Sequence, residues 1–246
     1  MMNSHSDNSF LLDGMTWSYS RIGAYNTCPY AFKSIYLDCE KQVDNAYAQW
    51  GSLMHDLLAN IYLDRMTFAE AKSKYIEMYE LEVGESFGLP STDDSYYFDG
   101  LDMLSEEYNP VTKPILAVEH KFVCDIDGIK FTGFIDLVAG SAANDLHIID
   151  HKSKKTVTAK DYIQLYLYAH NIWLDYGEFP KTLSLNLIRA RQLKTRDFSK
   201  KEYVAALDWA KSTIEKIYDD ALFVPTPSYF YCKNLCGIRH LCEEVI

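Results

Sequence analysis

Three charged residues near the ends of two apolar stretches, Asp136, Asp150 and Lys152, have the types and spacing best suited to chemistry in this sequence. The stretches, residues 131–138 and 146–152, have the length of strands and a turn-like segment between them, which predicts a hairpin. Side chains two residues apart share one face of a strand, so Asp150 and Lys152 are expected as neighbours with Cα atoms about 6.6 Å apart. Asp136 could approach them from the partner strand.

Together, these side chains are suited to metal-assisted hydrolysis of a phosphodiester bond. Two convergent carboxylates are oxygen ligands for a hard divalent ion, which usually completes its shell with water and substrate phosphate. A lysine ammonium can orient the attacking water and offset charge on the phosphate. The alternative is that charges at these strand ends simply face solvent, because a D-x-K pattern alone has little specificity.

The rest of the sequence predicts helices on both sides of these strands. Before the first strand, helices are expected near residues 18–37, 46–64, 67–87 and 94–108. Strands are expected near 115–123, 128–139, 145–152 and 182–190, and further helices over 160–176 and 199–221. Strands enclosed by helices predict an α/β fold in which a mixed central sheet is flanked by helices.

Length and composition fit one domain, because 246 residues with 48% hydrophobic content can bury a full core. We expect a mainly helical N-terminal part (15–110), a sheet core (111–200), and a C-terminal helix with a cysteine-bearing tail (200–246). No stretch approaches the roughly 20 apolar residues of a membrane span, and the N-terminal sequence lacks the pattern of a signal peptide. A cytoplasmic protein without membrane association is therefore expected.

Charge is unevenly distributed along the chain. The formal net charge of −11 disfavours a protein that coats nucleic acid without specificity. Residues 151–201, however, contain 11 lysines and arginines against 4 acidic residues, a balance of +7. Such a stretch could follow a phosphate backbone, or it could be an ordinary solvated surface. The candidates for backbone contacts are Lys154, Lys155, Arg189, Arg191, Lys194 and Arg196.

Two further pairs of residues are spaced to share one face of a helix. Gly51, which allows close backbone approach, lies four residues before His55, which can offer a neutral imidazole to a metal. Gln164 and Tyr168 are likewise four apart on the helix that follows Lys152, and they could contact a phosphate or a base edge. Taken singly, each pair is also compatible with ordinary packing.

The order of four short motifs along the chain is more informative than any one of them. G-x-x-x-H ends at His55, G-x-x-D at Asp136, D-x-K at Lys152 and Q-x-x-x-Y at Tyr168. This order resembles the RecB/AddB-type branch of the PD-(D/E)XK nuclease superfamily. The resemblance implies a restriction-endonuclease-like core.

The same resemblance implies roles for individual residues. The ligands that it implies for Mg²⁺ or Mn²⁺ are His55, Asp136 and Asp150. Lys152 would be the catalytic lysine, with Gln164 and Tyr168 also belonging to the active site. Glu119 occupies the place where the family often has an additional glutamate.

Four of the six cysteines are spaced to share a site. They are Cys28 near the N terminus and Cys232, Cys236 and Cys242 near the C terminus. Cytoplasmic cysteines are expected to be reduced. The one-plus-three arrangement resembles the iron-sulfur staple of AddB-type and CRISPR-adaptation nucleases, which implies a 4Fe-4S cluster, with structural Zn²⁺ as the alternative. Cys39 and Cys124 are expected to be buried apolar cysteines.

We therefore expect a Mg²⁺- or Mn²⁺-dependent deoxyribonuclease, an exonuclease acting on single-stranded DNA or DNA ends. Recombination, repair or phage DNA processing is the theme of the family, and a helicase or recombination protein is the expected partner. One alternative is a non-catalytic DNA- or partner-binding module that retains the fold, which the intact Asp136, Asp150 and Lys152 disfavour. The other is a zinc-stapled interaction protein, which metal analysis would identify.

Overall fold

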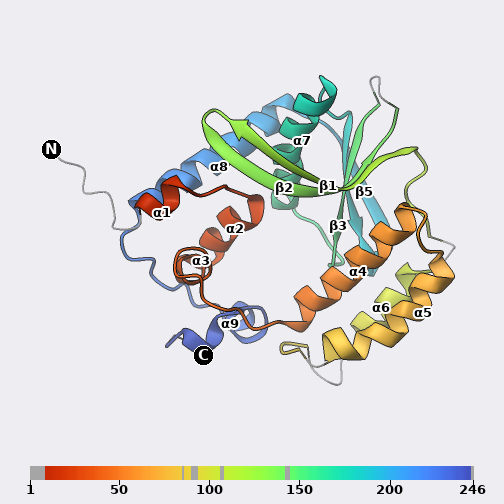
Figure 1. Cartoon of the computed structure of the whole chain (residues 1–246), viewed down its shortest axis with the longest axis horizontal. Helices are drawn as coiled ribbons and strands as arrows, with labels where there is room; N and C mark the ends of the chain where they lie inside the picture. The colour runs from red at the N-terminus through yellow and green to blue at the C-terminus, as the bar shows by residue number, and fades with distance from the viewer. Residues whose placement is uncertain (1–8, 85, 90–93, 106–107, 142–144, 245–246) are drawn as a thin grey trace.

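One five-stranded sheet with helices on both faces forms the centre of the molecule (Figure 1). The computed structural model describes residues 9–84, 86–89, 94–105, 108–141 and 145–244. In spatial order the strands are β1 (Ile115–Ile126), β2 (Ile129–Ala139), β3 (His147–Lys152), β4 (Thr182–Leu187) and β5 (Gln192–Asp197). Neighbouring strands are antiparallel except β3 and β4. The predicted mixed sheet flanked by helices is therefore confirmed.

The parallel pairing of β3 with β4 follows from the connection between them. Parallel neighbours need a crossover that returns the chain to the same end of the sheet. A 3₁₀ turn (Ala159–Tyr162) followed by α7 (Ile163–Tyr176) makes this crossover. As a result, α7 begins close to the end of β3, where Lys152 lies.

Two strand predictions had different outcomes. The hairpin expected from residues 131–138 and 146–152 is confirmed as the antiparallel pair β2–β3, although residues 142–144 of its turn lie outside the described part of the chain. The strand expected over 182–190 is β4, which ends at Leu187. The chain then turns at Arg191, which has a φ of +48°, and returns as β5, a strand that was not predicted. This edge strand, with the sequence QLKTRD, is polar and mostly exposed, so it lacks the apolar alternation that identifies a strand.

Separate hydrophobic cores cover the two faces of the sheet. The first core packs against α2 (Tyr19–Thr27), α3 (Pro29–Tyr36), α7 and α8 (Lys200–Asp219). The second packs against α4 (Ala46–Tyr62), α5 (Phe68–Tyr79) and α6 (Ser95–Met103). Ile148 belongs to the first core and Ile149 to the second, as the alternation of side chains along β3 requires.

The helix predicted over residues 18–37 is wrong in one respect, because it is two helices. Cys28, between α2 and α3, has an extended backbone (φ −159°, ψ 109°), the conformation favoured before a proline. Pro29 also lacks the N–H that a continuing helix would need. The break leaves Cys28 at a helix junction.

Other helix boundaries differ from prediction by a few residues. The helix predicted over 67–87 becomes α5 followed by a π-helical turn (Glu80–Gly84), and that predicted over 94–108 becomes α6. Residues 85 and 106–107 of those predictions lie outside the described residues. The short helices α1 (Ser9–Asp13) and α9 (Tyr229–Asn234) were not predicted. Within the described ranges, no helix combines the length and apolar content that crossing a membrane requires.

On either side of Asp136, which lies opposite Glu119, residues of β2 that are two positions apart point to different hydrophobic cores. Leu137 packs in the second core, although Ile135, two residues earlier, packs in the first. Residues two apart share a face in a regular strand, so the ladder is irregular at this point. Glu119, between the residues paired with Leu137 and Ile135, has a φ of +49°, in the left-handed region that non-glycine residues rarely adopt. The irregularity brings Glu119 and Asp136 to the same cleft.

Candidate active site

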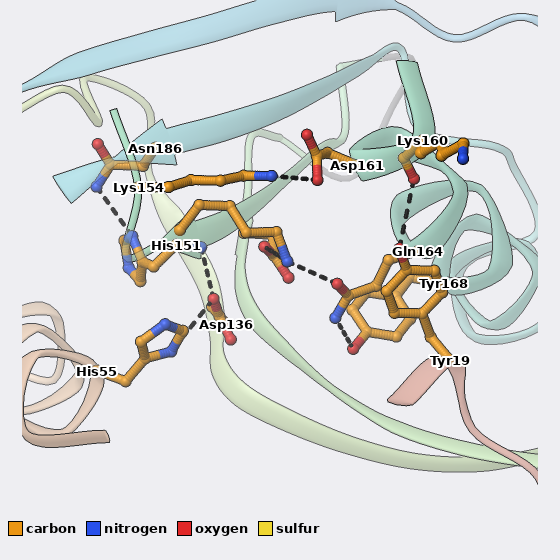
Figure 2. A network of polar contacts seen from close by, with 12 residues as sticks. Tyr19, His55, Asp136, His151, Lys154, Lys160, Asp161, Gln164, Tyr168 and Asn186 are labelled. Atoms are coloured by element: carbon orange, nitrogen blue, oxygen red, sulfur yellow. Dashed lines mark hydrogen bonds and ion pairs between the residues drawn. The ribbon is translucent and has the colours of Figure 1, made fainter. Parts of the chain in front are cut away.

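A cleft of about 710 Å³ contains every residue of the predicted active site. It lies between α4, the N-terminal end of α2, the first turn of α7 and strands β1 to β3. The predicted residues that line it are His55, Glu119, Asp136, Asp150, Lys152, Gln164 and Tyr168. In Figure 2, His55 approaches Asp136 from one side, while Gln164 and Tyr168 lie on the other. The fold thus joins residues that are far apart in the sequence.

His55, Glu119 and Asp136 form a compact group of potential metal ligands. One ligand atom from each lies within 4.8 Å of the others, and His55 Nδ1 is 3.5 Å from Asp136 Oδ2. Burial lowers the pKa of His55, but the nearby carboxylates, Asp136 above all, outweigh it and raise the pKa overall. An imidazole nitrogen with two carboxylate oxygens is a donor set that suits Mg²⁺ or Mn²⁺.

Asp150 lies outside this compact group, which therefore differs from the ligand set implied by the sequence. Its Oδ2 forms a 2.7 Å ion pair with Lys152 Nζ. Burial raises the pKa of Asp150 to about 6, while the Lys152 ammonium opposes this shift and the Asp136 carboxylate adds to it. A divalent cation between the two aspartates would offset their repulsion.

Lys152 is the first residue in a series of two hydrogen bonds that continues through Gln164 to Tyr168. Its Nζ donates to Gln164 Oε1 at 2.7 Å, and Gln164 Nε2 donates to the Tyr168 hydroxyl at 2.6 Å (Figure 2). Tyr168 is only 6% exposed and packs against Phe122, with ring centroids 5.5 Å apart. Gln164 therefore contacts Lys152 directly and Tyr168 contacts Gln164, and both line the cleft where they were predicted to meet a phosphate or base.

Two glycines of the predicted motifs differ in how tightly they are packed. A Cβ at Gly133 would lie 2.8 Å from Tyr168 Cε1 and 2.9 Å from Phe122 Cε1, so no side chain fits without displacing a ring. A Cβ at Gly51 would lie 3.6 Å from Ser153 Oγ, which is ordinary contact. The close backbone approach predicted at Gly51 is therefore not observed.

His151 of β3 supports Asp136 of the neighbouring strand β2. Its backbone N–H donates to Asp136 Oδ2 at 2.6 Å, and its Nδ1 lies 2.9 Å from Asn186 Nδ2 (Figure 2). Burial lowers the pKa of His151 to about 4, so the ring is neutral at pH 7. The roles of His151 and Asn186 were not predicted, because strand alternation indicates a face but not the partner that lies there.

Most of the basic residues expected to contact a phosphate backbone are paired within the protein. Arg189 Nε donates to Asp99 Oδ2 at 2.7 Å, and its guanidinium carbon lies 3.4 Å from the centroid of the Tyr96 ring. The other pairs are Arg191 with Ser105, Arg196 with Glu202, Lys154 with Asp161 and Lys155 with Asp99. Asp99 and Glu202 are the acidic residues in these pairs that lie outside 151–201, so the pairs offset the +7 balance only in part.

The cysteines predicted to share a site line one small hollow near the chain ends. They are Cys28, Cys232, Cys236 and Cys242. Tyr30 at the start of α3 donates to the Leu241 carbonyl at 3.1 Å, which ties the two ends together. Among the described residues, which include all six cysteines, no three thiols have sulfur atoms within 4.8 Å of one another. Cys124 is buried in the first core, as predicted, whereas the predicted burial of Cys39 is wrong, because Cys39 is exposed.

The mixed sheet presents Asp136, Asp150 and Lys152 to one cleft, an arrangement suited to metal-assisted hydrolysis of a phosphodiester bond. The sequence profile of the PD-(D/E)XK nuclease superfamily matches residues 16–243, and the chain belongs to this superfamily. The predicted superfamily is thus confirmed, whereas the RecB/AddB-type branch stays a prediction. Members of the superfamily generally use divalent metals, and the His55, Glu119 and Asp136 group could hold one.

Solved structures provide a second comparison. A Eubacterium rectale protein provisionally named an exonuclease has a TM-score of 0.55 and 11% identity, covering 98% of this chain and 94% of that one. The structure named SSO0001 has a TM-score of 0.32 and 15% identity, over 73% of this chain and 81% of the other. No curated protein matches the chain. At such low identity, the similarity to the Eubacterium rectale protein concerns the fold alone.

Proposed function

We propose that this chain is a Mg²⁺- or Mn²⁺-dependent deoxyribonuclease of the RecB/AddB type, an exonuclease acting on single-stranded DNA or DNA ends. One observation carries the proposal. Lys152 Nζ lies 2.7 Å from both Asp150 Oδ2 and Gln164 Oε1, in the cleft that also contains the His55, Glu119 and Asp136 group. A lysine held in place beside potential metal ligands is suited to hydrolysis of a phosphodiester bond.

In the proposed mechanism, His55, Glu119 and Asp136 hold the metal, and Asp150 adjoins them. When bound, the divalent ion neutralises charge at the scissile phosphate. Burial lowers the pKa of Lys152, but the Asp150 carboxylate raises it overall, so the side chain remains a cation. Lys152 can then orient the attacking water and offset the charge that develops on the phosphate oxygens.

The remaining residues of the cleft position these groups. Gln164 and Tyr168 fix the direction of the Lys152 ammonium, and the His151 N–H fixes one oxygen of Asp136. Such contacts matter because a displacement of about 1 Å at a reacting group can lower a rate by about a hundredfold. Their presence favours an active enzyme over a non-catalytic module that merely retains the fold.

We also propose a 4Fe-4S cluster held by Cys28, Cys232, Cys236 and Cys242. Support comes from the hollow that all four line. Tetrahedral zinc, with Zn–S bonds of about 2.3 Å, requires sulfur atoms about 3.8 Å apart. Structural Zn²⁺ would use the same four thiolates, and analysis of the bound metal distinguishes the two.

The direct test is cleavage of end-labelled DNA by anaerobically purified protein. Single- and double-stranded substrates are incubated with Mg²⁺, Mn²⁺ or EDTA, and we expect metal-dependent degradation that favours single strands or ends. Lys152→Ala should lower the single-turnover rate on the order of a hundredfold or more. Lys181→Ala is the matched control, because Lys181 is an exposed lysine outside the cleft.

Two results would contradict the proposal. Equal cleavage by Lys152→Ala and the parent would show that the assigned mechanism is wrong. Metal-dependent DNA binding without any cleavage would favour the non-catalytic module instead.

We propose a helicase or a recombination protein as the partner, by the same family resemblance. A pull-down with such proteins tests this proposal.

A further inference from the structure

Phe134 is a large apolar side chain exposed in the wall of an otherwise polar cleft. It is 50% exposed and lines the cleft together with Asp136 and Lys152. Exposing an aromatic ring to water is unfavourable by roughly 25 cal/mol per Å² of apolar surface. An exposed ring beside charged groups is therefore a candidate contact surface for a flat, partly apolar ligand.

Phe134 lies close in the strand to Asp136, one of the proposed metal ligands. It precedes Asp136 by two residues in β2, a separation of about 6.6 Å along a strand. This is close to the spacing between neighbouring phosphates of an extended nucleic-acid strand. A strand whose scissile phosphate lies at Asp136 would thus bring an adjoining nucleotide over the Phe134 ring.

Lys121 adds a cation to the same surface. It pairs with Phe134 across the β1–β2 ladder, and its Nζ lies 5.7 Å from the centroid of the ring. Both side chains are exposed. An aromatic face for a base beside an ammonium for a phosphate is the pairing that single-strand binding proteins use.

Duplex DNA would not use such a surface in the same way. Its bases already stack on one another, so a ring in the wall of a cleft can reach a base face only where the strand is single or the end is frayed. Stacking is also tolerant of sequence, because every base has a π-face. A surface of this kind therefore favours single strands without selecting a particular base.

We propose that Phe134 is a stacking platform for a base next to the scissile phosphate, with Lys121 contacting the adjoining backbone, and that this pair favours single-stranded DNA. The proposal rests on the proposed deoxyribonuclease function. It assigns to Phe134 a role in binding the substrate that is separate from the metal and from Lys152.

The test measures the affinity of the protein for single-stranded DNA after removal of the Phe134 ring, after removal of one DNA base, and after removal of both. Short single strands carrying 2-aminopurine, or one abasic residue, at successive positions are titrated with the protein in Ca²⁺ to limit cleavage. Phe134→Ala should weaken single-strand binding about 5- to 150-fold and abolish quenching of 2-aminopurine at one position, while Phe134→Trp keeps both. With the abasic residue at that position, the affinity of the strand for the parent should fall to the affinity of the normal strand for Phe134→Ala. The abasic strand should then bind Phe134→Ala with no further loss of affinity.

Phe98→Ala is the matched control, because Phe98 is 57% exposed but lies outside the cleft, and it should bind like the parent. If the parent cleaves single strands but Phe134→Ala binds and quenches normally, the stacking role is wrong and the nuclease assignment stands. If the parent neither binds nor cleaves DNA, both are wrong. Additive losses for Phe134→Ala and the abasic strand would also overturn the proposal, since the ring and the base would not be partners.

Discussion

Lys152 at the end of β3 and Gln164 in the first turn of α7 are joined by a 2.7 Å hydrogen bond between Nζ and Oε1. Lys152 can only donate, so the amide oxygen of Gln164 must accept from it, and the amide nitrogen is left to donate to the Tyr168 hydroxyl. The crossover between β3 and β4 thereby fixes the direction of the lysine ammonium. Gln164 is expected to act through Lys152 and not through DNA.

Replacement of Gln164 by Ala should therefore lower the rate of the chemical step and leave DNA affinity nearly unchanged. We expect a loss of about 10- to 100-fold in the single-turnover rate, the scale associated with a misplaced catalytic group. Tyr168→Phe, which retains the ring but cannot accept from Gln164, should cause a smaller loss. Weaker DNA binding by Gln164→Ala with an unchanged rate would instead support a direct contact with the substrate.

Glu119 is predicted to contribute to metal affinity, because its carboxylate lies within 4.8 Å of ligand atoms of His55 and Asp136. Glu119→Gln and His55→Ala should each weaken Mn²⁺ binding about tenfold or more, measured by calorimetric titration without DNA. Asp56→Asn is the control, since Asp56 is the exposed acidic neighbour of His55 and does not belong to the group. An unchanged Mn²⁺ affinity in Glu119→Gln would remove Glu119 from the ligand set.

Gly133 should tolerate no side chain, because a Cβ there would meet the rings of Tyr168 and Phe122 at 2.8 and 2.9 Å. Gly133→Ala is expected to lower the free energy of unfolding by about 1–3 kcal/mol, the usual range for overpacking. Gly23→Ala is the matched control, since a Cβ in the middle of α2 would meet no atom within 4 Å and should stabilise the helix by about 0.5–1 kcal/mol. Chemical denaturation of both variants measures the difference, and equal stability of Gly133→Ala and the parent would contradict it.

The sequence was sufficient to predict strands β1 to β4 and most of the flanking helices, and the order of its motifs identified seven residues that meet in the cleft. Strand alternation placed Asp150 and Lys152 on one face, and their side chains form an ion pair. Motif order, however, contains no information on backbone irregularity. Neither the positive φ of Glu119 nor the exclusion of Asp150 from the compact ligand group could be read from spacing.

A sum of charges along the sequence also omits tertiary contacts. A sum over residues 151–201 omits acidic partners that come from other parts of the chain, such as Asp99 in α6. Asp99 pairs with both Lys155 and Arg189, although it lies far from them in sequence. Tertiary contacts of this kind decide whether a basic stretch is available to a phosphate backbone.

Arg189 is consequently predicted to stabilise the fold and not to bind DNA. It is largely buried, and it connects the end of β4 to Asp99 and Tyr96 of α6. Arg189→Ala should lower the free energy of unfolding by about 1–3 kcal/mol, because it leaves Asp99 without one of its hydrogen bonds. The slope of single-strand affinity against salt concentration should remain that of the parent, whereas loss of a phosphate contact would lower it by roughly 0.7.

The cysteine hollow gives the last prediction, because it joins chain ends separated by most of the sequence. If Cys28, Cys232, Cys236 and Cys242 hold one 4Fe-4S cluster, anaerobic protein should be brown and contain about four iron atoms per chain. Replacing any of these cysteines by Ser should remove the colour and make both ends sensitive to protease, since closing so long a loop is entropically unfavourable. Cys39→Ser and Cys124→Ser are the controls and should keep the colour, because neither residue lines the hollow. A colourless, active preparation with one zinc per chain would overturn the iron-sulfur proposal and leave the nuclease proposal intact, because the cleft that contains Lys152 is formed without these cysteines.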